Sequence, residues 1–376
     1  MSYLFMKAED IIHIKEKLNG NSELQQTLKN KADTLMQTPP LSVTFHKSPA
    51  ASGNSHDYFS EGPYWWPDEK NPGGPYIRRD GEVNPNRFNH HFEDMQTLSD
   101  VIAGLAQAGL FLESDEYMQK AVSLAEIWFV NKATKMSPHL EYGQAVRGIC
   151  DGRSIGIIDT VQLIKVVAGL NLIEQTGKFT EQIELVKDWF RDYVYWMNHS
   201  KKGLEEKNYF NNHANWWNTQ AAVFSAFAGD DALMNACFEK YRTDVIPNQT
   251  NNEGAFSDEL TRTISYFYTL FNLEACAITC ELAYHKGVDL WNFITKEGKG
   301  IKKSISFFKP YYINPFLWPH QQLNAHKGVM REWLPMRLAA LHFCDEELRR
   351  ANQFRREDMK PFTTTCNLGL LDLIQE

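Results

Sequence analysis

The run FEDMQTLSDVIAGL, residues 92–105, decides the fold class of this chain. Its apolar residues recur every three or four positions, which places them on one face of an α-helix. They are Phe92, Met95, Leu98, Val101, Ile102 and Leu105. After a polar break at 113–115 the same spacing returns over 117–128. The pattern therefore predicts two successive helices joined by a short turn.

Helical periodicity extends outward from this run over most of the chain, and strand signals are nearly absent. We expect further helices over 157–176, 181–198, 215–228, 231–242, 261–285 and 329–343. Most connections are short, which is typical of antiparallel neighbours. A series of helical hairpins forms either a solenoid or a closed ring. Because no repeat of about 34 to 45 residues recurs, we expect an all-α fold of the α/α toroid type, an incomplete barrel of helical hairpins.

Residues 39–90 differ in kind from the rest of the chain. They hold eight of the fifteen prolines and five glycines, a density that excludes regular helix. A loop of this length is either disordered or functional, and its aromatic residues argue against disorder. We expect an ordered arm or lid over one side of a cleft, within a single domain that spans 1–376. The alternative is a structural strap that contacts no ligand.

Composition narrows the class of partner. The chain has 376 residues, a formal net charge of -8 and 43% hydrophobic residues, which is enough for a sizeable core. The acidic balance argues against nucleic acid as a partner, although cations that line one cleft can still bind an anionic polysaccharide. No stretch approaches the roughly 20 apolar residues of a membrane span. We expect no membrane partner, no metal and no cofactor.

The six cysteines form no CxxC pair and have no metal-type spacing with histidine. Cys276 and Cys280 are expected to be buried free thiols, and a disulfide framework among the six, Cys366 included, is not expected. The first residues, MSYLFMK, lack the basic and then apolar pattern of a signal peptide. As written, the chain is expected to be cytoplasmic, or periplasmic or secreted if a leader was removed.

Four polar residues in two short runs carry the chemistry that we expect. Asn212 and His213 lie in NNHANWW (211–217), while Arg262 and Tyr268 lie in ELTRTISYFY (259–268). These four groups suit the removal of a weakly acidic proton beside a carboxylate, as in a uronic acid polymer. The amide and the guanidinium neutralise the carboxylate. The imidazole serves as a base, and the phenol protonates the leaving oxygen.

Spacing alone does not place these residues together. Arg262 and Tyr268 are six positions apart, which on one helix puts them about 120° off the same face. They share a site only at a helix end or across a kink. Asn212 and His213 at a helix start are more often a cap followed by a hydrogen-bonded histidine. On residue types alone this structural explanation is favoured.

Motifs around these residues resemble those of the alginate lyase superfamily of polysaccharide lyases, the helical-toroid enzymes of family 5 and, more closely, of family 38. The resemblance covers residues 40–345, and the motifs are specific only when taken together. They are SGNSHDY (52–58), GPYWWP (62–67), YIRRDG (76–81) with Asn84-Pro85, Gln144 with GRSIG (152–156), NNH (211–213), and ELTR (259–262) leading to Tyr268.

The resemblance implies a role for each of the four residues. Asn212 and Arg262 are expected to neutralise the carboxylate. Tyr268 is expected to be the catalytic acid and, for syn elimination, also the base. His213 is expected to assist, or to serve as the base for the opposite epimer. The resemblance also implies a deep cleft or tunnel that an amino-terminal arm partly closes.

The chain departs from the family 5 pattern just after the arginine, where that family has a second arginine and a His-Asn-Tyr ending. Here residues 265–271 read SYFYTLF, so Tyr266 competes with Tyr268 for the catalytic position. We expect Tyr268 to be catalytic, because the family 38 pattern has a tyrosine there.

Further residues are expected to bind substrate. Gln144 and Arg153 are expected to hold carboxylates at neighbouring subsites, with ordinary helix-end roles as the alternative. Aromatic and cationic residues elsewhere are expected to bind sugar rings and carboxylates, namely His56, Tyr58, Trp65, Trp66, Arg78, Arg79, Tyr266, Trp318 and His320. Arg78 and Arg79 are equally typical of a solvated turn.

Two other classes of protein remain open. A glycoside hydrolase on the same fold needs two carboxylates about 5 to 9.5 Å apart, for which Asp57, Asp151, Asp258 and Glu259 are available. A carbohydrate-binding protein without activity needs none of these groups to react. Within the lyase class we expect alginate as the substrate, with β-1,4-glucuronan as the alternative.

Overall fold

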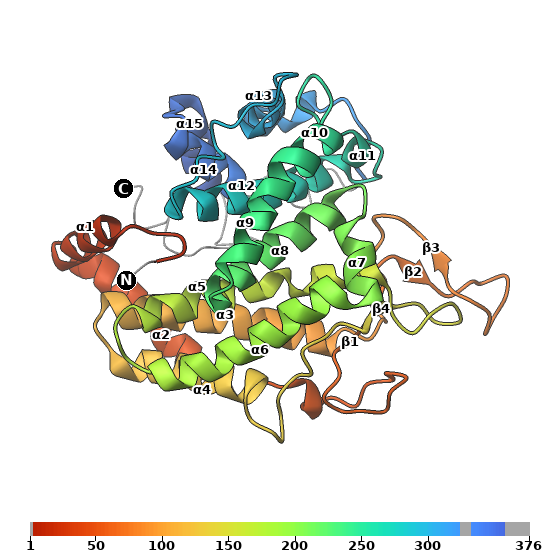
Figure 1. Ribbon diagram of the computed structural model, residues 1–376, viewed down its shortest axis with the longest axis horizontal. Coiled ribbons are helices and arrows are strands. Elements are labelled where there is room, and N and C mark those ends of the chain that lie inside the picture. Colours follow the sequence, from red (N-terminus) through yellow and green to blue (C-terminus); the bar gives the residue numbers. More distant parts are fainter. Residues whose placement is uncertain (1–2, 324–331, 358–376) are drawn as a thin grey trace.

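The computed structural model describes residues 3–323 and 332–357 and is mostly helical (Figure 1). The α-helices are α1 (Ala8–Asn19), α2 (Ser22–Met36), α3 (His90–Phe111), α4 (Asp115–Phe129), α5 (Leu163–Glu174), α6 (Thr180–His199), α7 (Lys201–Lys207), α8 (Asn212–Ala228), α9 (Asp231–Lys240), α10 (Ile246–Gln249), α11 (Ser257–Leu260), α12 (Ser265–His285), α13 (Ile301–Ile313), α14 (Leu334–His342) and α15 (Glu346–Glu357). Shorter helical segments are the 3-10 helices η1 (Val43–Phe45), η2 (Ser154–Gln162) and η4 (Pro315–Leu317) and the π-helical turn η3 (Tyr241–Val245).

The helices expected from periodicity are confirmed, with differences at some ends. The helix expected over 261–285 begins only at Ser265, where α12 starts, and residues 261–264 form a turn after the short helix α11, which ends at Leu260. In the segment expected over 329–343, α14 begins at Leu334, and 329–331 lie outside the described residues. Helices α1, α2, α7, α10, α11, α13 and α15 were not expected. In α2 only Ala32 is buried, so the sequence carries a weak apolar stripe there.

Capping residues explain where several helices begin and end. The Ser114 side chain accepts a hydrogen bond from the Tyr117 N–H at the start of α4, and Asp230 does the same for Leu233 at the start of α9. Such caps satisfy main-chain donors that the first helical turn leaves unpaired. Helix α8 ends at Ala228 and is capped by Gly229, whose φ of 86° is accessible to glycine without strain.

The helices form two layers. Inner helices α3, α5, α8, α12 and α14 pack in succession against one another, and α4, α6, α9, α13 and α15 cover them from outside. Burial follows the layers: α12 buries 18 of its 21 residues, whereas α6 buries 7 of its 20. Consecutive helices alternate between the layers, as a ring of antiparallel hairpins requires.

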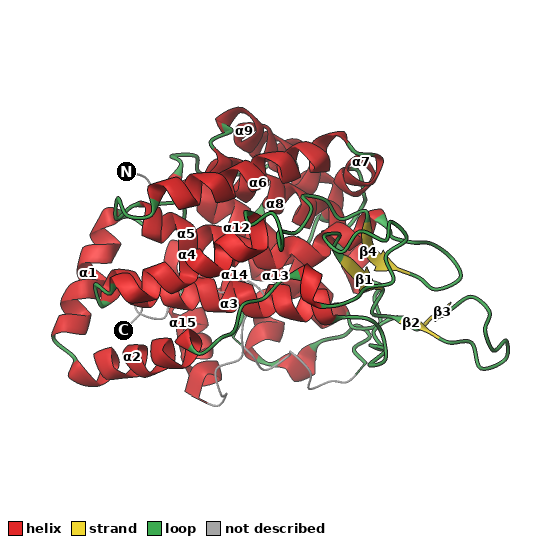
Figure 2. Cartoon of the chain, turned by 90° about the horizontal axis from the view of Figure 1, so that it is seen from below, coloured by secondary structure: helices red, strands yellow, loops and turns green. Residues whose placement is uncertain are grey.

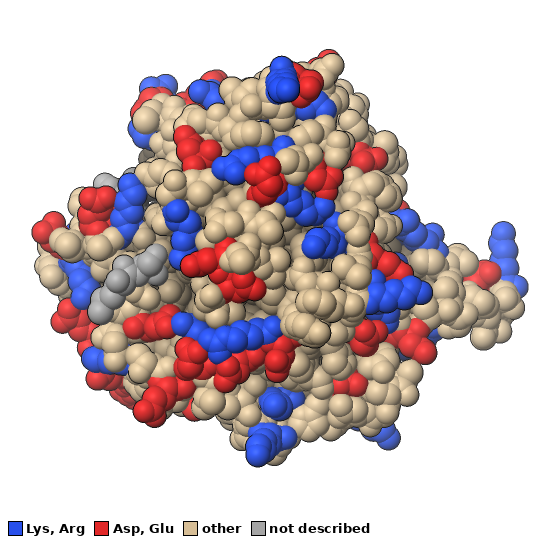
Figure 3. All heavy atoms as spheres, viewed as in Figure 1, with Lys and Arg blue, Asp and Glu red and all other residues tan. Residues whose placement is uncertain are grey.

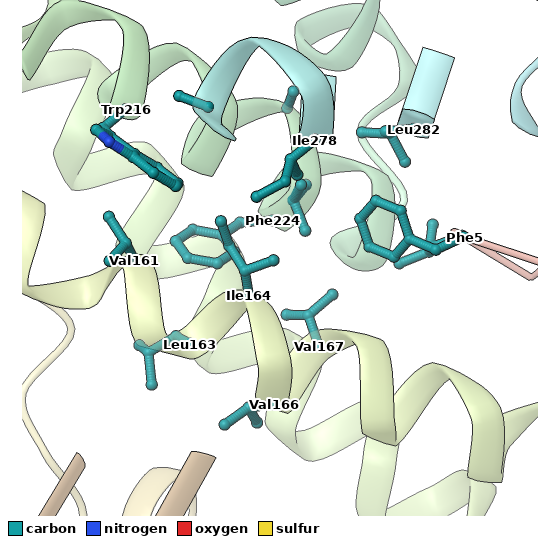
Figure 4. Close-up of a cluster of buried hydrophobic side chains, with 14 of the residues drawn as sticks. Phe5, Val161, Leu163, Ile164, Val166, Val167, Trp216, Phe224, Ile278 and Leu282 are labelled. Atoms are coloured by element: carbon teal, nitrogen blue, oxygen red, sulfur yellow. The ribbon is translucent and has the colours of Figure 1, made fainter. Parts of the chain in front are cut away.

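The core lies between the inner helices. Figure 4 shows Ile164 and Val167 of α5 beside Trp216 and Phe224 of α8, with Ile278 of α12 across from them. All five side chains are almost completely buried. Full burial of each aliphatic or aromatic side chain stabilises the fold by roughly 1.5–3 kcal/mol, so this cluster fixes the spacing of the inner helices.

One segment corrects the expectation that nothing in the chain is apolar enough to cross a membrane. The continuous helix Ser154–Glu174, made of η2 and α5, meets that test by length and composition. However, 89% of its most apolar window is buried inside the protein. Its hydrophobicity is that of an inner helix packed on both sides.

Residues 39–90, called the arm below, contain η1 and three short strands, and α3 begins at their last residue. Strand β1 (Phe59–Glu61) pairs in parallel with β4 (Tyr142–Ala145), and β2 (Trp65–Trp66) pairs antiparallel with β3 (Ile77–Arg78). Figure 2 shows that all four strands lie at the same end of the helical body. The sequence patterns did not predict these strands, because two to four residues are too few to show alternation.

Charges are mixed on the face of the molecule shown in Figure 3, where acidic and basic side chains alternate over the helices. Many form ion pairs on the outer layer, such as Arg191 with Glu184 and Asp188 on α6. Exposed pairs of this kind contribute little to stability. The surface drawn there carries no extended basic region.

Candidate active site

A cavity of about 550 Å³ lies where the arm meets the helical body. Its walls come from the arm, from β4 and η2, from the α7 to α8 connection, and from the segment that joins α11 to α12. All four residues expected to be catalytic line it, together with four of those expected to bind substrate. These are Asn212, His213, Arg262 and Tyr268, and Trp65, Arg78, Gln144 and Arg153.

Asn212 is the first residue of α8 and is completely buried. The preceding Asn211 caps the helix by accepting a hydrogen bond from the His213 N–H at 3.2 Å. Glu259 of α11 fixes the Asn212 side chain, since its Oε1 accepts from the main-chain N at 2.7 Å and from Nδ2 at 2.8 Å. The Asn212 Oδ1 atom has no hydrogen-bond partner among the described residues.

The burial of Glu259 has an electrostatic consequence. Burial raises the pKa of this carboxyl group, although the two hydrogen bonds from Asn212 act in the opposite direction. The acid on this helix connection therefore favours its neutral form more than an exposed glutamate does. Its task in the structure is to hold the amide of Asn212 at the cavity wall.

His213, the next residue, is held by a second buried acid. Its Nδ1 lies 2.9 Å from Oε1 of Glu206, which belongs to α7 and is completely buried. Burial raises the pKa of Glu206, and the nearby His213 lowers it in part. In the tautomer with the proton on Nδ1, the lone pair on Nε2 is left to act as a base.

Arg262 and Tyr268 meet because the helix expected to contain both begins only after Arg262. Arg262 lies in the turn after α11, and Tyr268 lies in the first turn of α12. The guanidinium carbon is 3.6 Å from the centre of the tyrosine ring, a close cation–π contact. The two residues thus share a site at a helix end, as their six-residue spacing requires.

The arm reaches this pair through Asp80. Arg262 donates from Nε to Asp80 Oδ2 at 3.2 Å and from Nη2 to Oδ1 at 2.8 Å, and Thr263 Oγ1 donates to the same carboxylate. Partial burial raises the pKa of Asp80, but the hydrogen bonds and charge of Arg262 outweigh it and the pKa lies well below its usual range. Burial lowers the pKa of Arg262, yet Tyr268 and Asp80 raise it overall.

A second arm residue contacts the tyrosine itself. The hydroxyl oxygens of Tyr64 and Tyr268 are 2.8 Å apart, across 204 positions of sequence. Burial raises the pKa of Tyr268 well above its ordinary value, Tyr64 raises it further, and Arg262 lowers it. Tyr268 is therefore a neutral phenol, able to donate its proton, at neutral pH.

Gln144 and Arg153 also line the cavity. Arg153 donates from Nε to the main-chain O of Gln144 and from Nη2 to its Oε1, both at 2.9 Å. Its guanidinium carbon lies 5.7 Å from the centre of a Trp65 ring. Arg78 lines the cavity as well, with its Nη2 bound to Asp80 Oδ1 at 2.6 Å.

Four arm residues expected to bind sugar are outside the cavity lining. Tyr58 is completely buried, and its hydroxyl donates to Asp159 Oδ2 at 3.0 Å. His56 Nδ1 lies 2.6 Å from the main-chain O of Lys135. Trp66 donates to the main-chain O of Glu82, and Arg79 stacks on the Trp66 ring at 5.1 Å. Their roles in binding stay predictions, and the contacts seen here are structural.

Three further candidates pack together beside α12, also outside the cavity lining. Tyr266 is 1% exposed and its ring packs against Phe308 and Trp318. Trp318 donates from Nε1 to Ser265 Oγ at 2.9 Å, and His320 contacts the Trp318 ring. The side chains of Tyr266 and Tyr268, two positions apart, thus point to different surroundings.

Sequence reasoning missed the residues that hold the site together. Asp80 and Tyr64 were only parts of motifs, Glu206 was not considered, and Glu259 was considered only for hydrolysis. A charged residue at a position that is otherwise buried is a signal for such a partner. The position of Glu206 one hairpin turn before His213 is visible only once α7 and α8 are known to pack together.

The acids considered for hydrolysis do not face one another across the cavity lining. Of Asp57, Asp151, Asp258 and Glu259, only Asp258 lines the cavity. Among the described residues no group of three or more His, Cys, Asp or Glu side chains is placed to hold a metal ion. Cys276 and Cys280 are buried free thiols, as expected, and Cys366 lies outside the described residues.

A family model for alginate lyase matches residues 42–318. The crystal structure of an alginate lyase from Bacteroides ovatus superimposes with a TM-score of 0.89 and 30% sequence identity, covering 98% of this chain and 99% of that one. This chain therefore belongs to the alginate lyase family, and the protein is a polysaccharide lyase.

More distant structures share the fold. Alginate lyase A1-III from Sphingomonas species A1 matches with a TM-score of 0.55 and 15% identity, over 85% of this chain and 88% of that one. A histidine-to-alanine variant of A1-III complexed with a tetrasaccharide gives the same TM-score at 16% identity, with the same coverage. The expected α/α toroid is confirmed. No curated protein matches the sequence.

Proposed function

We propose that this lyase cleaves alginate by β-elimination at the cavity lined by Asn212, His213, Arg262 and Tyr268. The observation that carries the proposal is the position of the Tyr268 phenol, which lies against the Arg262 guanidinium and within hydrogen-bond distance of Tyr64. A neutral, buried acid beside a cation suits the protonation of a leaving oxygen next to a carboxylate.

The first task is to neutralise the uronate carboxylate, because the proton at C5 is very weakly acidic while that group keeps its full charge. Asn212 and Arg262 are proposed to share this task. The amide is held by Glu259 and the guanidinium by Asp80, so neither side chain must reorganise during the reaction. Removal of one preorganised donor of this kind costs about 10²–10³ in rate.

The departure of O4 is assigned to Tyr268 as the general acid. Where another group is the base, the raised pKa of Tyr268 keeps the proton on the phenol until the C4–O4 bond breaks. Tyr266 is the less suitable alternative, because it lies in the packed cluster beside Trp318 and outside the cavity lining.

The base is proposed to depend on the epimer. In mannuronate the C5 proton and O4 lie on the same face of the ring, so Tyr268 acts on both. It enters this step as a phenolate, its own proton lost to solvent and its charge stabilised by Arg262. It takes the C5 proton and passes that proton to O4, which regenerates the phenolate. In guluronate the C5 proton and O4 lie on opposite faces, so a second group is needed. His213 fills that role, since Glu206 binds Nδ1 and leaves Nε2 for the proton.

We also propose that the arm covers one side of the bound polymer within a single domain. Its residues Trp65 and Arg78 line the cavity, and Tyr64 and Asp80 contact the two residues nearest the reaction. A polymer that carries one carboxylate per sugar complements the cations in this cavity. β-1,4-Glucuronan is the alternative substrate, since its carboxylate is the same and its hydroxyl configuration differs.

The decisive experiment is to incubate the protein with poly-mannuronate, poly-guluronate and glucuronan and to follow the ultraviolet absorbance of the new double bond. Cleavage of either alginate block is expected. Cleavage of glucuronan, without cleavage of either alginate block, would make glucuronan the substrate. New reducing ends without absorbance would show hydrolysis and reject elimination.

The assignment of the base is tested by His213→Ala. This variant is expected to lose activity on poly-guluronate while it keeps activity on poly-mannuronate, and equal losses on both would contradict the assignment.

A further inference from the structure

Asp159 is a buried acid that lines the cavity and that the proposed reaction does not use. It belongs to η2, and its carboxylate accepts three hydrogen bonds from other elements. Oδ2 accepts from the hydroxyls of Tyr58 at 3.0 Å and Ser60 at 2.6 Å, and Oδ1 accepts from Nε2 of Gln144 at 2.9 Å. Burial raises the pKa of Asp159, and these three donors lower it in part. The arm and β4 are thus joined at a single carboxylate.

This contact determines which way the amide of Gln144 faces. Since Nε2 donates to Asp159, Oε1 is directed to the other side, where it accepts from Arg153 Nη2. The main chain at Gln144 has a φ of 49°, which is unusual for a residue other than glycine, and its N–H donates to Ser60 Oγ at 2.8 Å. We expected Gln144 to bind a substrate carboxylate, but both polar atoms of its amide already have protein partners.

Arg153 is the group at the end of this chain of hydrogen bonds. Its two hydrogen-bond acceptors, the main-chain O and the Oε1 of Gln144, are both neutral, and burial lowers the pKa of the guanidinium. Among residues 3–323 and 332–357, no carboxylate forms an ion pair with it. The Arg153 side chain is partly buried, and it feels the charge of Asp159 without contacting that carboxylate, so neutral acceptors alone meet its hydrogen-bond donors. It lines a cavity proposed to take a polymer with one carboxylate per sugar.

We propose that Asp159 is a positioning residue that acts through Gln144 to present the Arg153 guanidinium to the carboxylate of a second uronate, next to the one being cleaved. The inference rests on the proposed function, because it assumes a polyuronate in this cavity. The second carboxylate supplies the charged hydrogen-bond acceptor that Arg153 lacks, and the Trp65 ring beside Arg153 gives a face for the same sugar. Asp159 itself contacts no substrate.

The role of Asp159 is tested by measuring ligand binding. The Tyr268→Phe variant is used as the parent protein, so that the ligand is not cleaved during the measurement. Calorimetry would measure the Kd of a mannuronate tetrasaccharide for that protein and for the same protein carrying Asp159→Ala. Because a hydrogen bond to a charged group is at stake, Asp159→Ala is expected to raise the Kd about 10- to 100-fold. The methyl-esterified tetrasaccharide is the matched ligand, and its Kd is expected to change less than about threefold. An unchanged Kd for the charged ligand overturns the proposal, as does an equal rise for both ligands.

Asp159→Asn separates positioning from packing. The asparagine keeps an oxygen for Gln144 Nε2 and a polar group for the two hydroxyls, so it is expected to restore most of the affinity. Gln144→Met serves where Asp159→Ala does not fold, since it breaks the same chain without opening a buried space, and it is expected to raise the Kd as Asp159→Ala does. A wild-type Kd in Gln144→Met would overturn the proposal.

Kinetics in the otherwise wild-type protein give the second readout. Asp159→Ala is expected to raise KM about 10- to 100-fold while kcat stays within about threefold, and a fall in kcat with unchanged KM contradicts the proposal. The two failures are distinguishable. If the wild-type protein cleaves no polyuronate, the proposed function fails. If it cleaves one and Asp159→Ala leaves KM unchanged, only the role of Asp159 fails.

Discussion

The two walls of the cavity are built differently. On the helical wall, Asn212 and His213 start one inner helix and are held by Glu259 and Glu206, both completely buried. On the arm wall, Asp80 and Tyr64 reach across from a segment rich in turns, and the Asp80 side chain is 20% exposed. The comparison indicates that the helical wall is set by packing before substrate arrives, whereas the arm wall depends on a few polar contacts with Arg262 and Tyr268.

The largest effect is expected where the walls meet. Tyr268→Phe removes the proton donor and the contact with Tyr64, and turnover is expected to fall about 10²–10⁴-fold with substrate affinity retained. Tyr266→Phe is the matched control, since its hydroxyl lies outside the cavity lining, where it contacts the main-chain O of Tyr311 at 3.4 Å and the side chain of Arg355, and its activity is expected within about twofold of wild type. Initial rates by ultraviolet absorbance check both. A larger loss in Tyr266→Phe than in Tyr268→Phe would exchange their roles.

The helical wall is tested at Glu259. Glu259→Ala leaves the main-chain N–H and the amide of Asn212 without their acceptor, and kcat is expected to fall about 10- to 100-fold, with a lower Tm. Glu259→Gln keeps an oxygen in the same place and is expected to retain most of kcat. If both variants turn over at the wild-type rate, the position of Asn212 does not depend on Glu259, and the helical wall is not set before substrate arrives.

The arm wall is tested at Asp80. Asp80→Ala breaks the paired hydrogen bonds to Arg262, which contribute roughly 1–3 kcal/mol to the contact between the arm and the helical body. Hydrogen exchange is expected to speed up over residues 62–87 and to stay unchanged in α8, with kcat/KM about tenfold lower. Faster exchange in α8 as well would mean that the two walls open together.

The smallest effect is a difference in the sign of pH dependence. The pKa of folded Asp80 lies below its unfolded value near 3.9, so its stabilisation is complete above that pH and is lost as pH falls. The pKa of folded Glu259 is raised above its unfolded value near 4.3, so stability decreases as pH rises from that value toward the folded pKa. The free energy of unfolding is measured in urea between pH 3 and 7. In Asp80→Asn it is expected to fall less steeply than in wild type as the pH is lowered. In Glu259→Gln it is expected to fall less steeply than in wild type as the pH is raised. If the free energy of unfolding depends on pH in the same way in both variants, the opposite effects assigned to Asp80 and Glu259 are contradicted.

The sequence predicted the helices better than the contacts between them. Periodicity found the inner helices because one or both of their faces are apolar, and it missed α2, whose exposed residues carry no stripe. The resemblance led to Asn212, His213, Arg262 and Tyr268, which share one cavity. Their partners Asp80, Glu206 and Glu259 were not found, because a buried acid is recognised only when its surroundings are known. Tyr58 and Trp66 look like sugar-binding aromatics in the sequence. In the structure the Tyr58 hydroxyl donates to the Asp159 side chain, and Trp66 donates to the main-chain O of Glu82.

The contacts between Tyr64 and Tyr268 and between Asp80 and Arg262 span 204 and 182 positions of sequence. Contacts of such long separation form late in folding, because the intervening chain must first be ordered. During synthesis the arm emerges early and meets its partners only after the inner helices up to α12 have been made. Recovery of activity is therefore expected to lag behind recovery of helical circular dichroism when the denatured protein is refolded.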